Sequence, residues 1–174
     1  KQTDSLKESL AWSHSALDDF KSIDEGSGEA WALKTIGDAR FRLSEHDKAL
    51  DAYNGALSIL RTMEDPIGEA NTLLSIGELM SMKGKPDSAQ QSCQEALNLY
   101  RIAGDRLGEA NALSSLGQLR LLSDDLNGAE DAQNQALELF RTMGLHLGEA
   151  NCLQTLGDLE QRRDALDAAA EFYQ

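Results

Sequence analysis

The ten residues GEANTLLSIG, from Gly68 to Gly77, occur four times in this chain with small changes. The other copies are GEAWALKTIG from Gly28, GEANALSSLG from Gly108 and GEANCLQTLG from Gly148, so successive copies begin 40 residues apart. A fixed period between about 20 and 50 residues is typical of solenoids, propellers and arrays. The copies therefore predict a repeat protein with 40-residue units.

Apolar residues within each unit recur every three or four positions. Ala70, Leu73 and Ile76 follow this spacing in the first half of one unit, and Ala89 and Ala96 begin a second set. Such spacing places apolar side chains on one face of a helix. Each unit is therefore predicted to contain two helices.

Residues between the expected helices suit helix ends. Gly104 and Gly144 are predicted to take the left-handed conformation that often closes a helix. Asp65 and Asp105 are placed to cap the next helix with a side-chain oxygen. Leu145 occupies the same position in the last junction, and we expect a weaker cap there.

A glycine column runs through the middle of the first helices and raises the question of phosphate binding. The column contains Gly37, Gly77, Gly117 and Gly157, and an alanine column follows twelve residues later with Ala49, Ala89, Ala129 and Ala169. Glycine inside a helix costs about 1 kcal/mol relative to alanine, so we expect a packing benefit, namely close approach of the two helices at the alanine. No copy has the lysine and hydroxyl residue of a phosphate-binding loop.

Composition limits the possible partners and compartments. The 174 residues include 30 acidic and 16 basic side chains, for a formal net charge of -14, which disfavours nucleic acid and anionic membrane surfaces as partners. No apolar run is long enough to span a bilayer. Cys93 and Cys152 fall in different repeat columns, which favours a reducing, cytoplasmic location. Because the first residue is lysine, we expect a piece of a longer protein.

The sequence contains no recognisable catalytic constellation. His14, His46 and His146 lie in different units, and neither cysteine has a histidine at a spacing typical of a nucleophile pair. The SEHD cluster, residues 44–47, contains groups that can bind metals, but capping at a helix junction explains it more simply. We therefore predict no enzyme activity, no metal site and no cofactor.

The spacing of these residues resembles the tetratricopeptide repeat. That family's pattern of a large apolar residue, a glycine, and two alanines is matched by Leu33, Gly37, Ala49 and Ala56. The 40-residue unit is similar to the variety found in Pins-type spindle-orientation adaptors and kinesin light chains. Where the family usually has proline at the end of the second helix, this chain has arginine, and we expect these side chains to stabilise the helix end through its dipole. The arginines are Arg61, Arg101 and Arg141.

The resemblance implies an all-α fold, a right-handed superhelical α-solenoid of stacked antiparallel helix pairs. We predict one array, with the second helix of a preceding repeat at 1–27, complete repeats at 28–67, 68–107 and 108–147, and a truncated repeat at 148–174. The ends then lack the polar caps that terminal repeats usually have. Phe172 and Tyr173 lie at the truncated end.

The resemblance also implies that a partner peptide lies along a concave face formed by the first helices. The residues that this assigns to the groove are Trp31, Lys34, Asp38, Phe41, Asn71, Leu74, Glu78, Met82, Asn111, Ser114, Gln118, Asn151, Gln154 and Asp158. Neighbouring positions are Arg42, Ser81, Leu121, Leu122, Gln161 and Arg162, of which the two leucines are equally compatible with the core. Lys34, Arg42 and Arg162 balance Asp38, Glu78 and Asp158, so this face is nearly neutral although the chain is acidic.

The asparagines of this face have two possible roles. Asn71, Asn111 and Asn151 share one column of the repeat and could bond to the backbone of an extended peptide, because an amide both donates and accepts. Alternatively, each could bond only to the backbone of its own helix.

Two functions follow from these observations. The first is a non-enzymatic module that binds a protein or peptide, such as an amphipathic helix, in its groove and serves as an adaptor or sensor segment. The second is a structural spacer that self-associates through its uncapped repeat ends or acidic helix faces.

Overall fold

The structure is a computed structural model that describes the backbone of residues 2–172 and the side chains of residues 5–164. This part of the chain is entirely helical, as predicted, and contains no strand. The helices are α1 (Gln2–Ser22), α2 (Gly26–Arg42), α3 (His46–Thr62), α4 (Pro66–Met82), α5 (Pro86–Ala103), α6 (Arg106–Leu122), α7 (Leu126–Thr142) and α8 (His146–Phe172). None of these described helices has both the length and the apolar character needed to cross a bilayer.

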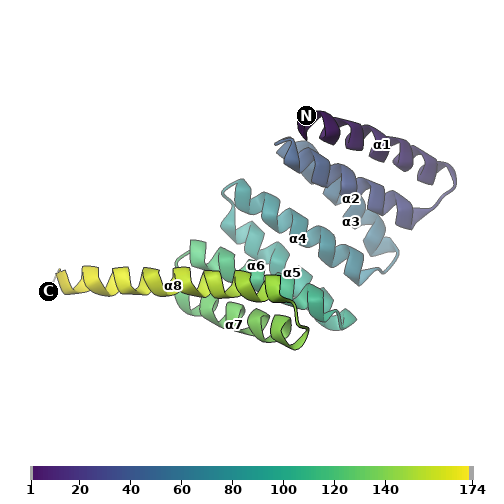
Figure 1. The fold of residues 1–174 in the computed structure, drawn as a ribbon. Coiled ribbons are helices and arrows are strands. Elements are labelled where there is room, and N and C mark those ends of the chain that lie inside the picture. Colours follow the sequence, from purple (N-terminus) through teal and green to yellow (C-terminus); the bar gives the residue numbers. More distant parts are fainter. Residues whose placement is uncertain (1, 173–174) are drawn as a thin grey trace. The chain divides into compact units, whose positions relative to one another are not determined.

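The helices form two units, residues 1–103 and residues 104–174. In the first unit each of α1 to α4 packs against the next helix along the chain, and in the second unit α6 packs on α7 and α7 on α8 (Figure 1). First helices also meet directly, α2 with α4 and α6 with α8. Stacked helix pairs are the architecture of an α-solenoid, which confirms the predicted fold class.

The turns between helices share one conformation that recurs once in every half repeat. Each turn contains one residue with φ between +55° and +71°. These residues are Asp24, Ser44, Glu64, Gly84, Gly104, Asp124 and Gly144. In the six turns with a described bond, the next amide reaches back five residues to a helix carbonyl at 2.9–3.0 Å, as in Glu25 to Phe20. This closure satisfies a carbonyl that the helix end leaves open, and within each unit it joins successive antiparallel helices.

The predicted caps of α4 and α6 are confirmed. Asp65 accepts a hydrogen bond from the amide of Gly68 at 2.9 Å, and Asp105 accepts from the amide of Gly108 at 3.0 Å. Asp125 does the same for α7. The described contacts at the start of α8 include no such bond from Leu145, as expected for an apolar residue in that position.

The glycine column packs against a different residue than predicted. A Cβ added to Gly37 would enter the ring of Tyr53, and one on Gly77 would lie 2.6 Å from Cys93 Sγ. Each of these partners is sixteen residues after its glycine, whereas the prediction placed an alanine twelve residues on. The helix turn at the alanine does lie close, since the carbonyl of Ala89 is 3.4 Å from the added Cβ of Gly77. The glycines therefore make room mainly for the larger side chain one turn further along the second helix.

The GEA triplet joins α2, α4 and α8 to the helix that precedes each of them. The glycine leaves room for an apolar side chain eight residues earlier, as for Gly148 and the ring of Phe140. The glutamate pairs with the arginine of the preceding helix, with Arg61 Nε 2.6 Å from Glu69 Oε1. Arg141 and Glu149 repeat this pair at 2.9 Å. The prediction is thus too narrow for Arg61 and Arg141, because each lies in the last turn of its own helix and also pairs with a glutamate of the next helix.

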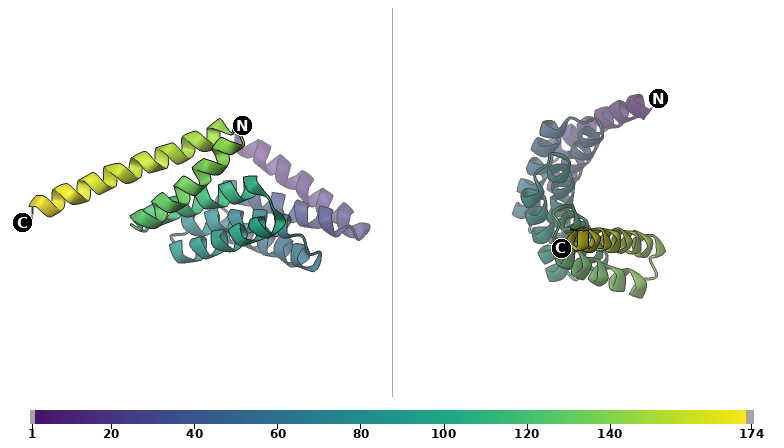
Figure 2. Two further views of the ribbon diagram at one scale, coloured as in Figure 1. Left: turned by 90° about the horizontal axis from the view of Figure 1, so that it is seen from below. Right: turned by 90° about the vertical axis from the view of Figure 1, so that its left-hand side faces the viewer.

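The last helix departs from the two-helix pattern. The sequence places Ala169 in the column that begins a second helix, yet α8 continues as one helix from His146 to Phe172. Its C-terminal part extends beyond α7 (Figure 2). The side chains of Ala169 and Phe172, and both Tyr173 and Gln174, lie outside the described residues.

Candidate functional site

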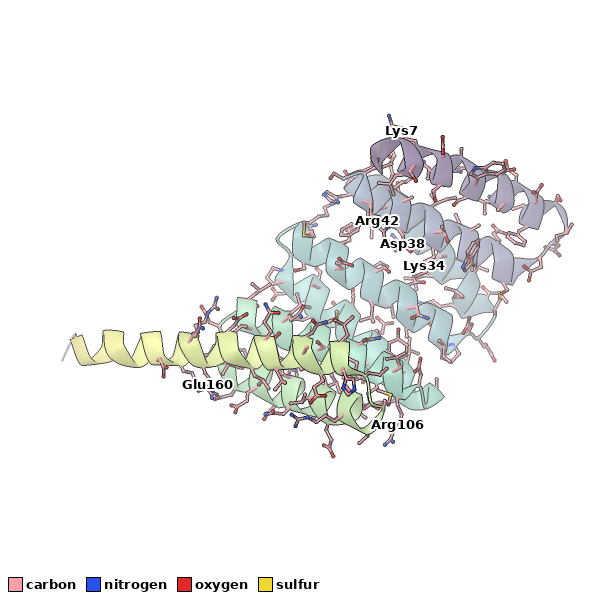
Figure 3. All side chains as sticks on the ribbon, viewed as in Figure 1. Lys7, Lys34, Asp38, Arg42, Arg106 and Glu160 are labelled. Atoms are coloured by element: carbon pink, nitrogen blue, oxygen red, sulfur yellow. The ribbon has the colours of Figure 1, made fainter. Side chains whose placement is uncertain are left out.

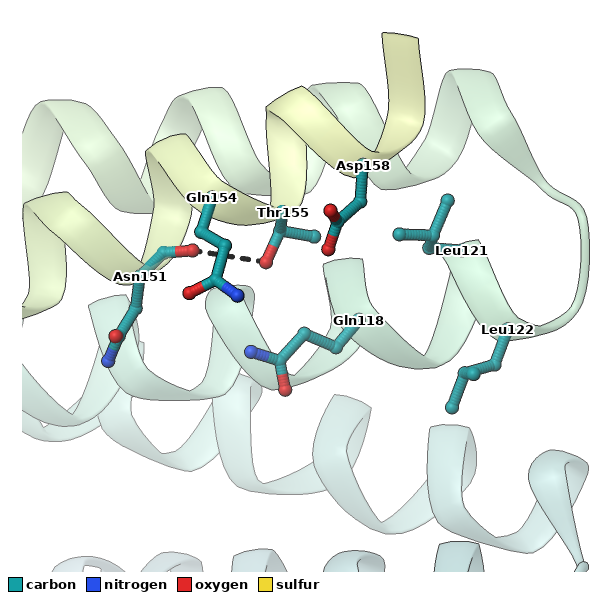
Figure 4. Close-up of a pocket in the computed structure, with 7 residues that line it drawn as sticks. All are labelled: Gln118, Leu121, Leu122, Asn151, Gln154, Thr155 and Asp158. Atoms are coloured by element: carbon teal, nitrogen blue, oxygen red, sulfur yellow. Dashed lines mark hydrogen bonds between the residues drawn. The ribbon is translucent and has the colours of Figure 1, made fainter. Parts of the chain in front are cut away.

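The second unit contains a pocket of about 330 Å³ between its two first helices, α6 and α8. Its walls combine amides, a carboxylate, a hydroxyl and two leucines (Figure 4). They are Gln118, Leu121, Leu122, Asn151, Gln154, Thr155 and Asp158.

Helical spacing brings these side chains together. Asn151, Gln154 and Asp158 are three and four residues apart on α8, so they lie on one face of that helix. Gln118, Leu121 and Leu122 occupy the last turn and a half of α6, which lies beside α8. The pocket is thus built on rigid helices rather than on loops.

The polar groups of the pocket have capacity for a ligand. Among the described residues, the side-chain amides of Gln118, Gln154 and Asn151 have no hydrogen-bond partner, and all three residues are exposed. Thr155 is buried and donates its hydroxyl to the carbonyl of Asn151 at 3.1 Å. Asp158 is exposed and supplies the one formal charge of the lining. This set can bond to a peptide backbone and can pair with one cation.

The structure brings together four of the predicted groove residues here, namely Gln118, Asn151, Gln154 and Asp158. Leu121 is half-buried and Leu122 is 68 % exposed, so the second leucine is not a core residue. Thr155 is a lining residue that the prediction omitted. Its column also contains Ser75 and Ser115, and that shared hydroxyl character was the available signal.

Asn71 has a role that neither predicted alternative included. Its side-chain oxygen accepts a hydrogen bond from the hydroxyl of Tyr100 at 2.8 Å. The bond joins α4 to α5 within the first unit, so this amide oxygen already serves the packing of a helix pair. Asn111 and Asn151, which are exposed, have no such described bond.

The charged groove positions of α2 also bind one another. Lys34 donates to Asp38 at 2.9 Å, and Tyr53 on α3 donates to the other oxygen of that carboxylate at 2.8 Å. Burial, with the charge of Asp38 beside it, holds the pKa of Tyr53 well above its usual range. Lys34, Asp38 and Arg42 follow one another along α2 (Figure 3), but Asp38 is largely used within the protein.

The remaining predicted positions differ in exposure. Trp31 and Met82 are 62 % and 68 % exposed, and both are available for contacts. Leu74 is half-buried, as is Phe41, whose ring centroid lies 5.9 Å from that of His46. Glu78 and Gln161 are exposed, whereas Ser81 and Ser114 are half-buried. Arg162 bonds to Asp124 at 2.7 Å rather than balancing Asp158.

The SEHD residues and the two cysteines, which were considered as chemical groups, serve the turn, ion pairs and the core. In the SEHD cluster, Ser44 takes a left-handed turn conformation, and Glu45 pairs with Arg40 at 2.7 Å and with Lys48 at 3.3 Å. The residues that the structure describes contain no group of three potential metal ligands. Both cysteines are free and buried, and burial raises the pKa of Cys93 to about 11.

Comparison with known proteins finds one family model that matches part of the chain. Residues 68–142 match the family model described as tetratricopeptide repeat. This segment is similar to tetratricopeptide repeats. No curated protein matches the chain.

Two solved structures show how far the likeness extends. The crystal structure of BtubC (BKLC) from P. vanneervenii superposes with a TM-score of 0.80 at 18 % identity, over 93 % of this chain and 68 % of that one. The Sgt2 TPR domain from Aspergillus fumigatus superposes with a TM-score of 0.59 at 25 % identity, over 78 % of this chain and 82 % of that domain. The first likeness concerns the fold alone.

Proposed function

We propose that this protein is a non-enzymatic interaction module that binds a peptide along its first helices, with the α6–α8 pocket as a main contact site. The observation that carries the proposal is the convergence of Gln118, Asn151, Gln154 and Asp158 on one pocket beside two leucines. Tetratricopeptide repeats generally bind proteins, which supports the same function.

The composition of the pocket indicates the kind of peptide. Three side-chain amides can bond to exposed peptide backbone groups, which an extended segment has and a helix does not. Leu122 provides apolar surface, and Asp158 favours a lysine or arginine on the ligand. An extended segment with an apolar residue near a basic one therefore fits this pocket better than the amphipathic helix that we expected from the sequence.

Further features of the module are part of the same proposal. We propose the repeat boundaries 28–67, 68–107 and 108–147, with partial units at 1–27 and 148–174, and an array of the variety found in spindle-orientation adaptors and kinesin light chains. The recurrence of the left-handed turn at half-repeat intervals supports two equal helices per unit. An adaptor role, a cytoplasmic location and a right-handed superhelix remain predictions.

An array of short immobilised peptides, varying the position of one leucine and one lysine, tests the proposal on the 174-residue chain. Peptides that bind are then labelled and titrated by fluorescence anisotropy against Asn151→Ala and Asp158→Asn. The matched controls are Asn134→Ala and Asp131→Asn, which make the same changes at exposed positions of α7.

We expect the pocket variants to weaken binding by about tenfold and the controls to leave it unchanged. Asp158→Asn affects only peptides that contain a basic residue. If pocket and control variants bind equally well, the α6–α8 pocket is not the site. Retained binding that is lost on Trp31→Ala would instead place the site on the first unit.

A further inference from the structure

The tip of Tyr53 marks a place where two first helices meet above a second helix. Tyr53, on α3, is 1 % exposed and donates its hydroxyl to Asp38 of α2 at 2.8 Å. Ser75 of α4 also lies within hydrogen-bonding reach of that hydroxyl. The polar end of this buried side chain therefore lies between α2 and α4, and its hydrogen bonds are made within the protein.

Gln133 of α7 occupies the same column as Tyr53 and is 0 % exposed. Its amide lies against Gly117 of α6, and its Nε2 donates to the carbonyl of Ser114 at 2.9 Å. The hydroxyl oxygen of Ser114 is 4.0 Å from the thiol of Cys152 on α8. The amide of Gln133 therefore lies where α6 meets α8.

The α6–α8 pocket lies above this amide. The counterparts of Asp38 and Ser75, which surround the hydroxyl of Tyr53, are Gln118 and Thr155. Both of these residues line the pocket (Figure 4). Gln133 thus forms the floor of the pocket beneath two of its lining residues.

The floor has an unused hydrogen-bond acceptor. The side-chain oxygen of Gln133 is buried and has no hydrogen-bond partner among the described residues, which is unfavourable for a buried polar atom. Because the oxygen is shielded from solvent, a ligand reaches it only when a neighbouring side chain turns aside. Gln118 is next to Gly117 and is exposed, and its amide has no described partner, so this side chain is free to turn.

We propose that the pocket takes the side chain of a lysine and that Gln133 accepts a hydrogen bond from its ammonium group, an inference that rests on the proposed peptide-binding function. An ammonium group has three donors and no acceptor. Three helices supply acceptors here, namely the amide oxygens of Gln118 and Gln133 and the carboxylate of Asp158. Leu121 and Leu122 line the same pocket and pack against the four-carbon stem of the ligand.

Acceptors on three helices suit an ammonium group better than a guanidinium group. The planar fork of arginine pairs best with the two oxygens of one carboxylate, whereas a compact ammonium group takes acceptors from several directions. Norleucine has the stem of lysine without its charge and leaves the oxygen of Gln133 unpartnered. The pocket should therefore rank lysine above both arginine and norleucine.

Three versions of one peptide test the proposal on the 174-residue chain. The tightest-binding peptide of the array that contains lysine is compared, by fluorescence anisotropy, with versions in which arginine or norleucine replaces the lysine. The variant is Gln133→Met, which keeps the length of the side chain and removes the amide. Gln135→Met makes the same change at an exposed position of α7 and is the matched control. Urea unfolding without peptide measures the stability of each chain.

We expect the parent chain and the control to bind the lysine version about tenfold more tightly than the norleucine version, and also more tightly than the arginine version. In Gln133→Met the preference for lysine over norleucine falls to about twofold, while the affinity for the norleucine version is unchanged. The stability of Gln133→Met without peptide equals or exceeds that of the parent. The reason is that the unpartnered oxygen is gone, whereas the carbonyl of Ser114 keeps its bond within α6.

Two kinds of result overturn the proposal and leave the peptide-binding function in place. One is a parent chain that binds the lysine and norleucine versions equally, prefers arginine, or binds only peptides without lysine. The other is a Gln133→Met chain that is less stable and binds all three versions more weakly, since such a loss indicates a packing role. An array on which no peptide binds instead refutes the proposed function, and this inference fails with it.

Discussion

The left-handed turn positions allow a quantitative test of how much the turns between helices affect the stability of the chain. Glu64 adopts φ +55° between α3 and α4, a conformation that costs a residue with a Cβ about 1–2 kcal/mol. Glycine avoids this cost but loses about 0.5–1 kcal/mol through the greater freedom of the unfolded chain. We therefore expect Glu64→Gly to be more stable than Glu64→Ala by about 0.5–1 kcal/mol, which in a domain of this size raises Tm by about 1–4 °C.

The alanine variant makes this comparison specific, because both variants remove the same charge. Gly84 supplies the reverse case, since it has φ +68° and a Cβ built on it meets nothing within 4 Å. Gly84→Ala should thus destabilise the chain by a similar amount through backbone conformation alone. Asp51, exposed within α3, should show the opposite order, with alanine about 1 kcal/mol more stable than glycine.

Urea unfolding followed by far-ultraviolet circular dichroism measures these variants and the parent under the same conditions. The reasoning is refuted if Glu64→Ala is as stable as Glu64→Gly, or if the order at residue 64 equals that at residue 51. Either result means that the left-handed conformation at residue 64 costs no measurable free energy. The recurrence of that conformation would then say nothing about the stability of the chain.

Three further predictions concern the packing between helices. Gly37→Ala should destabilise the chain by roughly 1–3 kcal/mol in urea unfolding, because the added methyl enters the buried ring of Tyr53. The Cys93 thiol, with its pKa raised to about 11, should react with a disulfide reagent at pH 8 far more slowly in the folded chain than in urea. The neighbouring Arg141 lowers the pKa of Glu149, so the pair stabilises the fold above the unfolded pKa of about 4.3, and this stability is lost as pH falls through the lower folded pKa. Glu149→Gln should therefore lose less stability than the parent between pH 5 and about pH 3 in thermal unfolding.

The fold could be predicted from the sequence because the repeat pattern fixes it redundantly. Helix periodicity, glycine turns at residues 104 and 144 and caps at Asp65 and Asp105 all indicated the same helix pairs. The left-handed conformation of Asp24, Ser44, Glu64 and Asp124 was not predicted, because none of these residues is glycine. Their half-repeat spacing from the glycine turns was the signal that could have located them.

Side-chain partners on different helices could not be predicted in the same way. Tyr100 is far from Asn71 in the sequence, and only the packing of α5 on α4 brings its hydroxyl to the amide. The glycine column was assigned to the wrong partner for a related reason. Sequence spacing identifies the face of each helix, but the register between two helices depends on side-chain volume, and Tyr53 occupies the space beside Gly37.

Comparison of the units with one another separates packing positions from candidate binding positions. The column that contains Gly37, Gly77, Gly117 and Gly157 keeps one residue type, and in the three complete helix pairs this glycine lies against a side chain of the second helix. The column that contains Lys34, Leu74, Ser114 and Gln154 changes its chemistry in every unit. A position that served only the packing shared by all units would keep side chains of one size. The column of Lys34 does not, so its side chains could make different contacts with a partner in each unit. Of that column, only Gln154 is exposed among the described residues, and it lines the α6–α8 pocket. On the proposed function, this pocket rather than the glycine column would select between peptides of different sequence.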